Sequence, residues 1–260
     1  MRARKVFLTA IVAALMLVIL PSGSHALTAD EIVKKAISSH YGETLRAVVR
    51  VTNFQGNKER SKHVLWLMVQ VEEPESVVFM DFTEPPESKG LRLLCRIKPR
   101  NKPEAYMYLP ASGQTVQVDV DDPSTDIGGT GLTIGDFRPL IPKEGEKKKL
   151  VREEKTEGLE CWVVEITVPG SKEKRLVWIS KEQLNVVKVE QFGANGKLQR
   201  TLRVIKFFKT RKGRLYPREE IVSIPGKTKI RVRQDGAVWG IVIPKELLNP
   251  KTFGTFKWRM

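Results

Sequence analysis

The sequence predicts a mainly β protein with few helices, of the α+β class, in which the strands are antiparallel. Three observations indicate this fold class. Many short segments alternate apolar and polar residues with a period of two, as half-buried strands do. Turn dipeptides such as Asn195-Gly196 and Pro225-Gly226 separate these segments at hairpin spacing. One long amphipathic pattern, after Thr28, has the period of a helix.

The first 26 residues have the pattern of a secretory signal peptide. Positive residues precede an apolar run from Val6 to Leu20, and small residues follow up to Ala26. The run is shorter than the roughly 20 residues that cross a bilayer, which favours a cleaved signal over a membrane anchor. We expect cleavage after Ala26, no lipid attachment at the new start, and one domain over residues 27–260 in the periplasm.

The charge balance narrows the class of partner. The formal charge is +15, and three positive charges lie before the expected cleavage point, which leaves +12. In an exported protein this balance favours anionic lipid surfaces or acidic partner proteins over nucleic acid. The basic run from Lys143 to Lys149 is interpreted as a solvated turn, with contact to anionic lipid as the alternative.

Two cysteines, Cys95 and Cys161, follow the expected cleavage point. An oxidising compartment permits a disulfide between them. Each also occupies an apolar position of a predicted strand, where a small buried thiol packs equally well. Both interpretations stay open at this point.

The elements begin with one helix. Thr28-Ala-Asp-Glu31 has the form of a capping box, apolar residues follow at helical spacing, and Gly42 ends the pattern. Strands are predicted at 45–54 and 63–72. The second of these strands is apolar on both faces, so both of its sides need cover.

The stretch from Val77 to Pro142 is the centre of the prediction. It contains four short strands with period-two alternation, separated by turn residues such as Pro85-Pro86 and Gly90. A glycine-rich segment follows the last of these strands. There Thr133-Ile-Gly-Asp136 has a capping signal, which predicts a short helix that covers the strands as a lid.

The second half is predicted to be a series of hairpins with glycine turns. Its strands are expected at 150–155, 159–168, 175–180, 185–192, 198–209, 215–224 and 227–233. A short helix ending near Leu248 follows them. So many strands present more apolar sheet surface than one long helix can cover. A closed barrel interior, a second sheet or a bound lipid would each cover the excess.

Catalytic and metal-binding patterns fail on their context. Ser171 and Lys174 match a Ser-x-x-Lys motif, but they follow a turn and lack the partner motifs of the penicillin-interacting enzymes. His40 and His63 have no Cys or second His nearby in the sequence. The acidic residues within 119–126 fit a polar loop better than a glycosidase pair. We therefore expect no enzymatic activity, no cofactor and no metal.

Four blocks occur in order along the chain: Phe79-Met-Asp-Phe-Thr-Glu-Pro, Lys89-Gly-Leu-Arg-Leu-Leu, Ala105-Tyr-Met-Tyr-Leu-Pro110 and Gly129-Thr-Gly-Leu-Thr-Ile-Gly-Asp-Phe137. In order and spacing they resemble the LolA-like outer-membrane lipoprotein-sorting family, and the resemblance covers most of residues 27–260. It implies an unclosed antiparallel β-barrel of about eleven strands with an N-terminal helix and a short helical lid. It also implies a cavity that holds acyl chains or other hydrophobic ligands.

These observations lead to two functional hypotheses. The first is a monomeric periplasmic carrier that binds acyl chains of a lipoprotein or lipid and transfers them from an inner-membrane donor to an outer-membrane acceptor. The second is an envelope interaction or sensor protein of the same fold, whose concave face is filled by its own side chains and which docks a protein partner. A hydrolase would need a nucleophile that the sequence does not offer.

Two sets of residues are candidates for the ligand site. The candidate ligand-lining residues are Trp66, Met68, Val78, Met80, Phe82, Leu91, Leu93, Met107, Leu109, Val116, Val118 and Trp178. The candidate lid residues are Ile127, Gly128, Gly129, Gly131, Ile134, Phe137, Leu140 and Ile141. Alternation shows which residues share a strand face, whereas the face that points inward has to come from the structure.

Overall fold

The computed structural model of the protein describes residues 27–40, 44–72, 75–97, 103–120, 126–137, 145–210, 213 and 215–258. The expected signal peptide and two candidate lid residues, Leu140 and Ile141, lie outside these ranges, as does the side chain of Phe137. Within the described ranges, no helix is both long and apolar enough to cross a membrane.

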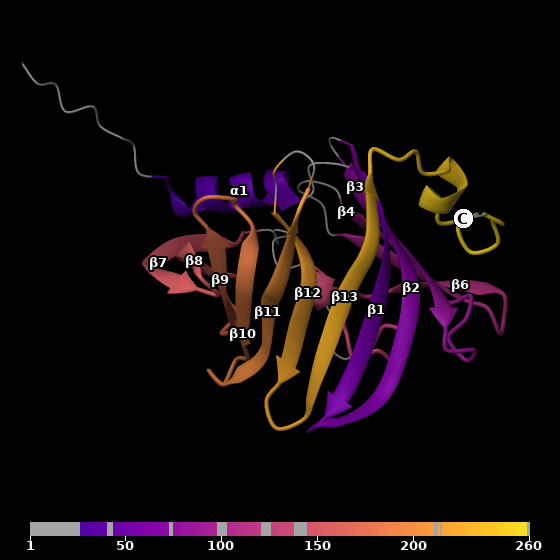
Figure 1. Cartoon of the computed structure of the whole chain (residues 1–260), viewed down its shortest axis with the longest axis horizontal. Helices are drawn as coiled ribbons and strands as arrows, with labels where there is room; N and C mark the ends of the chain where they lie inside the picture. The colour runs from indigo at the N-terminus through magenta and orange to yellow at the C-terminus, as the bar shows by residue number, and fades with distance from the viewer. Residues whose placement is uncertain are drawn as a thin grey trace, which may run out of the picture.

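The described chain is built almost entirely of strands (Figure 1). The helices are α1 (Ala29–His40) and two short 3-10 helices, η1 (Ile134–Phe137) and η2 (Lys245–Leu248). The strands are β1 (Leu45–Gln55), β2 (Lys58–Glu72), β3 (Glu75–Glu84), β4 (Arg92–Ile97), β5 (Glu104–Leu109), β6 (Gln114–Val118), β7 (Lys147–Thr156), β8 (Leu159–Thr167), β9 (Lys174–Ser180), β10 (Val186–Phe192), β11 (Leu198–Lys209), β12 (Leu215–Ile224) and β13 (Thr228–Trp239).

All of these strands belong to one antiparallel sheet of 13 strands, in the order β6-β5-β4-β3-β2-β1-β13-β12-β11-β10-β9-β8-β7. Each half of the chain forms its own meander, and the pairing of β1 with β13 joins the halves. The edge strands β6 and β7 do not pair, so the sheet is unclosed. The predicted fold class is confirmed. The count of about eleven strands is low by two, because every segment that alternation predicted became a strand.

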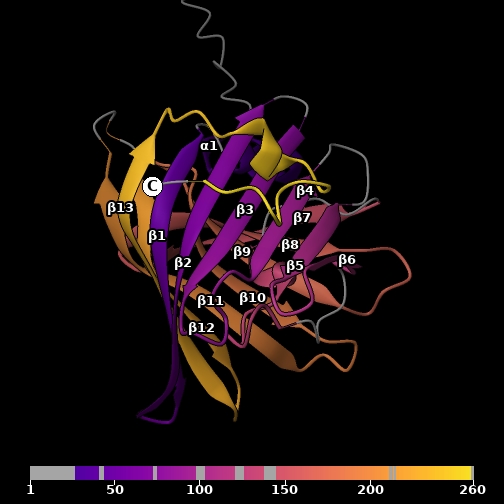
Figure 2. The same ribbon diagram turned by 90° about the vertical axis from the view of Figure 1, so that its right-hand side faces the viewer.

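The sheet curves, so alternate residues of each strand face a concave or a convex side. Figure 2 shows the strands of the first half in front and β8 to β11 behind them. Cross-strand neighbours fix which parity faces inward: Val49 lies opposite Leu65, and Val51 lies opposite Val232. All four are buried in the core on the concave side.

Helix α1 covers the concave side of the second half. Its capping box forms as predicted, since the Thr28 amide donates to Glu31 Oε2 (2.8 Å) and the Glu31 amide donates to Thr28 Oγ1 (3.3 Å). Ile32, Val33 and Ala36 then bury one face of the helix against β8, β9 and β10. The helix therefore supplies part of the cover that the sheet needs.

The last residues cover the convex side of β2 to β4. We call residues 241–258, which include η2, the strap; Figure 2 shows it in yellow, crossing in front of β3. Leu247 and Phe253 are fully buried against Met68 and Phe79. The strap is the second cover that β2 requires, because β2 is apolar on both faces.

Arg92 of β4 holds the strap at its end. Its Nη1 donates to the carbonyl oxygens of Phe253 (2.7 Å), Gly254 (3.0 Å) and Phe256 (2.9 Å). Its Nε lies 3.2 Å from Asp81 Oδ2, which also accepts a hydrogen bond from the Trp258 indole (2.8 Å). One guanidinium thus satisfies several carbonyls that would otherwise be buried without donors.

Candidate functional site: a lid over the concave face

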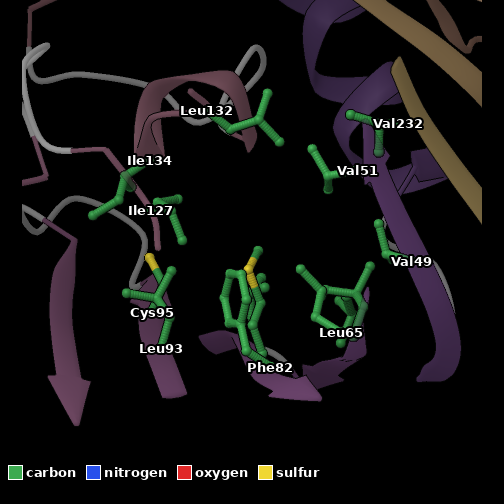
Figure 3. Close-up of a cluster of buried hydrophobic side chains, with 14 of the residues drawn as sticks. Val49, Val51, Leu65, Phe82, Leu93, Cys95, Ile127, Leu132, Ile134 and Val232 are labelled. Atoms are coloured by element: carbon green, nitrogen blue, oxygen red, sulfur yellow. The ribbon is translucent and has the colours of Figure 1, made fainter. Parts of the chain in front are cut away.

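The concave side of the first half carries a continuous apolar surface. Figure 3 shows its side chains converging from neighbouring strands on a common interior. β12 and β13 extend it with Val222, Ile230 and Val232. The other buried members on the strands and their ends are Leu45, Ala47, Val49, Val51, Leu65, Leu67, Val69, Val78, Met80, Phe82, Leu91, Leu93, Cys95, Ala105 and Val120.

Residues 126–137, which we call the lid, lie over this surface. Ile127, Leu132 and Ile134 are 1%, 2% and 2% exposed and pack into the same core as the strands. In Figure 3 these three side chains face the interior from the side opposite Phe82. The lid therefore fills space on the concave face with its own apolar side chains.

The lid is a compact turn held by its own hydrogen bonds. The Ile127 amide donates to the Leu132 carbonyl oxygen (2.8 Å), and the Thr130 hydroxyl donates to the Ile127 carbonyl oxygen (2.7 Å). The Gly131 amide donates to both carboxylate oxygens of Asp126 (3.0 and 3.1 Å). Because these bonds lie within the segment, the lid can leave the sheet without losing them.

Glycine is required at two lid positions for conformation and for close approach. Gly128 and Gly131 have φ of +63° and +72°, which L side chains rarely adopt. A Cβ on Gly128 would lie 2.7 Å from Leu91 Cδ2, and one on Gly131 would lie 3.1 Å from Ile230 Cδ1. The closed position of the lid thus depends on these glycines.

A buried ion pair joins the lid to β11. Asp136 caps η1 as the sequence predicted, since its Oδ2 accepts from the Thr133 amide (2.8 Å). Its Oδ1 lies 2.7 Å from Arg200 Nε, and Arg200 Nη2 donates to the Gly131 carbonyl oxygen (2.5 Å). The two charged side chains are only 4% and 13% exposed. We call this contact the lid ion pair.

Beside the lid ion pair is a small pocket with room for about one water molecule. Asp136, Val189, Gln191, Arg200 and Leu202 line it. It marks the point where the cover provided by the lid meets the strands that α1 covers.

Glu220 of β12 adds an acid to the same interior. Its cross-strand neighbours Val204 and Val232 are buried apolar residues. Burial, and secondarily repulsion from Asp136, raises the pKa of Glu220 to about 7. Burial also raises the pKa of Asp136, although Arg200 opposes this effect. The apolar interior thus includes the permanent cation of Arg200 and the carboxyl groups of Asp136 and Glu220.

His63 lies on the concave face near the lid. It pairs across strands with Val51, is 4% exposed, and packs edge-on against the Phe82 ring with centroids 6.2 Å apart. Burial lowers the pKa of His63, although Asp126 opposes this effect. Among the described residues, no group of three or more His, Cys, Asp or Glu side chains could hold a metal ion.

The structure brings most of the candidate lining residues to one place. The residues on the concave side are Val78, Met80, Phe82, Leu91, Leu93, Met107, Leu109, Val116 and Val118. Val116 is placed there by its pairing with Met107 across strands. Of the candidate lid residues, Ile127 and Ile134 are buried against this surface.

Three candidate lining residues lie on the convex side instead. Met68 packs under the strap, and Trp66 packs edge-on against Trp258 of the strap, 6.1 Å between centroids. Trp178 packs with Cys161 in a separate convex cluster. The reason is strand parity: their immediate neighbours in sequence take the inward positions, which alternation alone could not decide.

Arg200 and Glu220 were not among the candidates. Arg200 faces the same side of β11 as the inward residue Leu202, and Glu220 faces the same side of β12 as Val222. A charged residue at an inward strand position was therefore the signal that the sequence offered. That signal could be used only once the inward parity of β11 and β12 was known.

The remaining candidate chemistry is absent from this site. No disulfide joins Cys95 and Cys161, since the first lies on the concave side and the second on the convex side. Burial raises the pKa of Cys161 to about 11. Ser171 is exposed in a turn, and Lys174 binds Glu165 at 3.0 Å. No described contact joins these groups into a catalytic arrangement.

Comparison with known proteins finds solved structures of the same fold. A putative outer-membrane lipoprotein-sorting protein domain from Vibrio parahaemolyticus is 17% identical, with a TM-score of 0.75 over 86% of this chain and 97% of that one. A DUF1329 family protein from Desulfovibrio piger is 13% identical, with a TM-score of 0.74 over 84% of this chain and 94% of that one. A LolA superfamily protein from Nitrosomonas europaea is 18% identical, with a TM-score of 0.65 over 86% of this chain and 98% of that one. A search of curated protein sequences finds no match.

An unclosed half-barrel whose concave face is covered by a helix and a lid is the fold that this chain shares with these solved structures. A family model described as "-like: Uncharacterized protein" matches residues 75–234, more than half of the chain. The chain therefore belongs to the family of this model. Its fold is the LolA-like fold of the solved structures above.

Proposed function

We propose that this protein is a non-enzymatic carrier that binds acyl chains of a lipoprotein or lipid on its concave face and transfers them within the periplasm to the outer membrane. The observation that carries this proposal is the packing of Ile127, Leu132 and Ile134 into the apolar face. These lid side chains occupy the place that an acyl chain would take. Fold relatives that include a putative lipoprotein-sorting domain support the proposal.

Simple energetics favour exchange of the lid for a ligand. Burying one aliphatic side chain contributes about 1.5–3 kcal/mol, so three lid side chains contribute roughly 5–9 kcal/mol. Burying an acyl chain of about sixteen carbons contributes on the order of 13 kcal/mol at 0.8 kcal/mol per CH₂. A lipid can therefore displace the lid with free energy to spare, and the lid can still keep the empty protein soluble.

The first experiment asks whether lipid accompanies the protein. The chain is purified from its own envelope fraction, and native mass spectrometry is used to detect bound lipid. The stripped protein is then mixed with a fluorescent fatty acid. We expect both co-purifying lipid and uptake of the probe. If neither is found reproducibly, the carrier proposal fails.

A matched pair of variants locates the binding surface. Met107 and Tyr106 are neighbours on β5, both half-buried, on the concave and convex sides respectively. We expect Met107→Gln to weaken binding of the fluorescent fatty acid about tenfold, because a polar amide replaces apolar contact area. Tyr106→Gln should leave binding within about twofold. The reverse order of effects would place the ligand elsewhere.

The second candidate function is an envelope protein that docks a protein partner. The observation that favours it is the same filled concave face, because a sheet covered by its own lid and helix needs no ligand for stability. A protein that never exchanges its lid for lipid, in the uptake experiment above, would support this function over the carrier.

A further inference from the structure

Arg200 depends on the lid for its charge partners. Within the described part of the chain, its guanidinium contacts Asp136 and the Gly131 carbonyl oxygen, both in the lid. Its neighbours on the sheet side of the pocket are the apolar Val189 and Leu202 and the uncharged Gln191. When the lid leaves the concave face, the cation loses both contacts at once.

A cation left in this position must be paired again or hydrated. A buried guanidinium without an anion is strongly unfavourable, and the strands around it supply no replacement that is positioned like Asp136. Glu220 lies on the neighbouring strand β12. It pairs with Val204, which is four residues away from Arg200 along β11. A ligand that carries its own anion would remove this cost, because a carboxylate or phosphate matches the fork of the guanidinium.

The lid itself has the chemistry of such a ligand. Its apolar side chains Ile127, Leu132 and Ile134 occupy the concave face, and its carboxylate, Asp136, lies two residues beyond Ile134 on Arg200. We propose that the carried molecule is an anionic amphiphile, whose acyl chain replaces the lid side chains and whose carboxylate or phosphate head replaces Asp136 on Arg200. This inference rests on the proposed carrier function and names its ligand class.

The Arg200 nitrogens have capacity for this head. The Nε contact with Asp136 is close but is not aligned as a hydrogen bond, so the contact is mainly ionic. The adjacent pocket and the amide of Gln191 provide room and a further donor beside the guanidinium. A two-oxygen anion can thus take the place of one carboxylate without rebuilding the strands.

Displacement of a neutral dye tests the inference separately from the function. The mature chain is loaded with N-phenyl-1-naphthylamine, and dodecanoate, dodecyl phosphate and dodecan-1-ol compete for the site. Wild type should release the dye to the two anionic amphiphiles at concentrations at least tenfold lower than to the alcohol. Acetate and inorganic phosphate should not release it, which separates an amphiphile site from a free-anion site.

Two substitutions on the same strand complete the test. In Arg200→Gln the preference for the anionic heads should fall to about one, with dye binding retained. Arg203→Gln is the matched control, since Arg203 is exposed on β11 and pairs with Glu157. Arg203→Gln should keep the wild-type preference.

Equal competition by dodecanoate and dodecan-1-ol in wild type, or an unchanged preference in Arg200→Gln, overturns the inference while leaving the carrier function standing. If wild type binds no dye and no amphiphile, the carrier function fails and this inference fails with it.

Discussion

Glu220 occupies a concave position whose cross-strand neighbours, Val204 and Val232, are apolar. Burial penalises its carboxylate, so the folded chain binds this proton more tightly than the unfolded chain does. The pKa of Glu220 is raised from the ordinary 4.5 to about 7. Its contribution to the free energy of unfolding therefore falls as pH rises from about 4.5 to about 7, and it stays at its lowest above that range.

This residue gives the first prediction. We expect Glu220→Gln to be more stable than wild type by about 3 kcal/mol at pH 8 and nearly equally stable at pH 4, below the ordinary pKa, since one pKa unit corresponds to about 1.4 kcal/mol. Urea denaturation at both pH values measures the difference. Glu219→Gln is the control, because Glu219 pairs with Lys206 and Arg231. A Glu220→Gln advantage that does not grow with pH would contradict the prediction.

Arg92 gives a second prediction at the residue scale. Arg92→Met removes the donor for three strap carbonyls and the cation beside Asp81, and it leaves those acceptors buried. The free energy of unfolding should fall by about 3 kcal/mol. Arg231→Met, which removes a half-exposed ion pair with Glu219, should cost no more than about 1 kcal/mol. Chemical denaturation of the two variants tests the contrast, and equal losses would remove the special role of Arg92.

At the scale of elements, the lid differs from the rest of the fold because internal hydrogen bonds fix its turn, whereas its apolar side chains belong to the core of the sheet and Arg200 bonds it to β11. An alanine at Gly128 should therefore weaken the closed position without unfolding the sheet. The added Cβ meets Leu91 and Phe82, and the backbone conformation itself costs about 1–2 kcal/mol for an L residue.

The third prediction follows from this difference. Gly128→Ala should change the rate of fatty-acid exchange at least fivefold, while the midpoint of thermal unfolding changes by only a few degrees. Stopped-flow fluorescence and calorimetry measure the two quantities. Gly196→Ala is the matched control, since Gly196 also has positive φ but has no atom within 4 Å of its added Cβ. Loss of the folded state in Gly128→Ala, or normal exchange, would show that the segment is not a lid.

At the scale of the whole molecule, local patterns predicted the elements well. The alternation of apolar residues and the glycine turns gave the strand segments, and the Thr28–Glu31 and Thr133–Asp136 signals gave both capped helix starts. These features depend on residues close in sequence. That Trp66, Met68 and Trp178 face the convex side could not be predicted, because strand facing depends on what covers each side of the sheet.

Long-range contacts were the part that sequence patterns could not supply. The strap covers β2 to β4 only because the chain returns there after β13. Arg200 meets Asp136 across 64 positions of sequence because β11 and the lid share one interior. Neither contact has a periodic signature. A charged residue at an inward strand position was the one local sign that something specific lay opposite.

The two thiols allow lid opening to be separated from unfolding of the whole molecule. Cys95 lies beneath the lid on the concave side, and Cys161 lies in the convex cluster of the other half. A thiol reagent can reach Cys95 when the lid opens, but it can reach Cys161 only through opening of the sheet. We therefore expect wild type to be labelled faster at Cys95 than at Cys161.

The fourth prediction concerns how the lid ion pair controls this difference. In Asp136→Asn the charge partner of Arg200 is lost, which should raise the open population and speed labelling of Cys95 at least tenfold. Cys161 should be labelled at the wild-type rate, because its cluster contains no lid residue. Peptide mass spectrometry after timed labelling follows both sites in one sample. Equal acceleration at both thiols would mean that the lid opens only when the whole sheet unfolds, and a carrier could not exchange its ligand in that way.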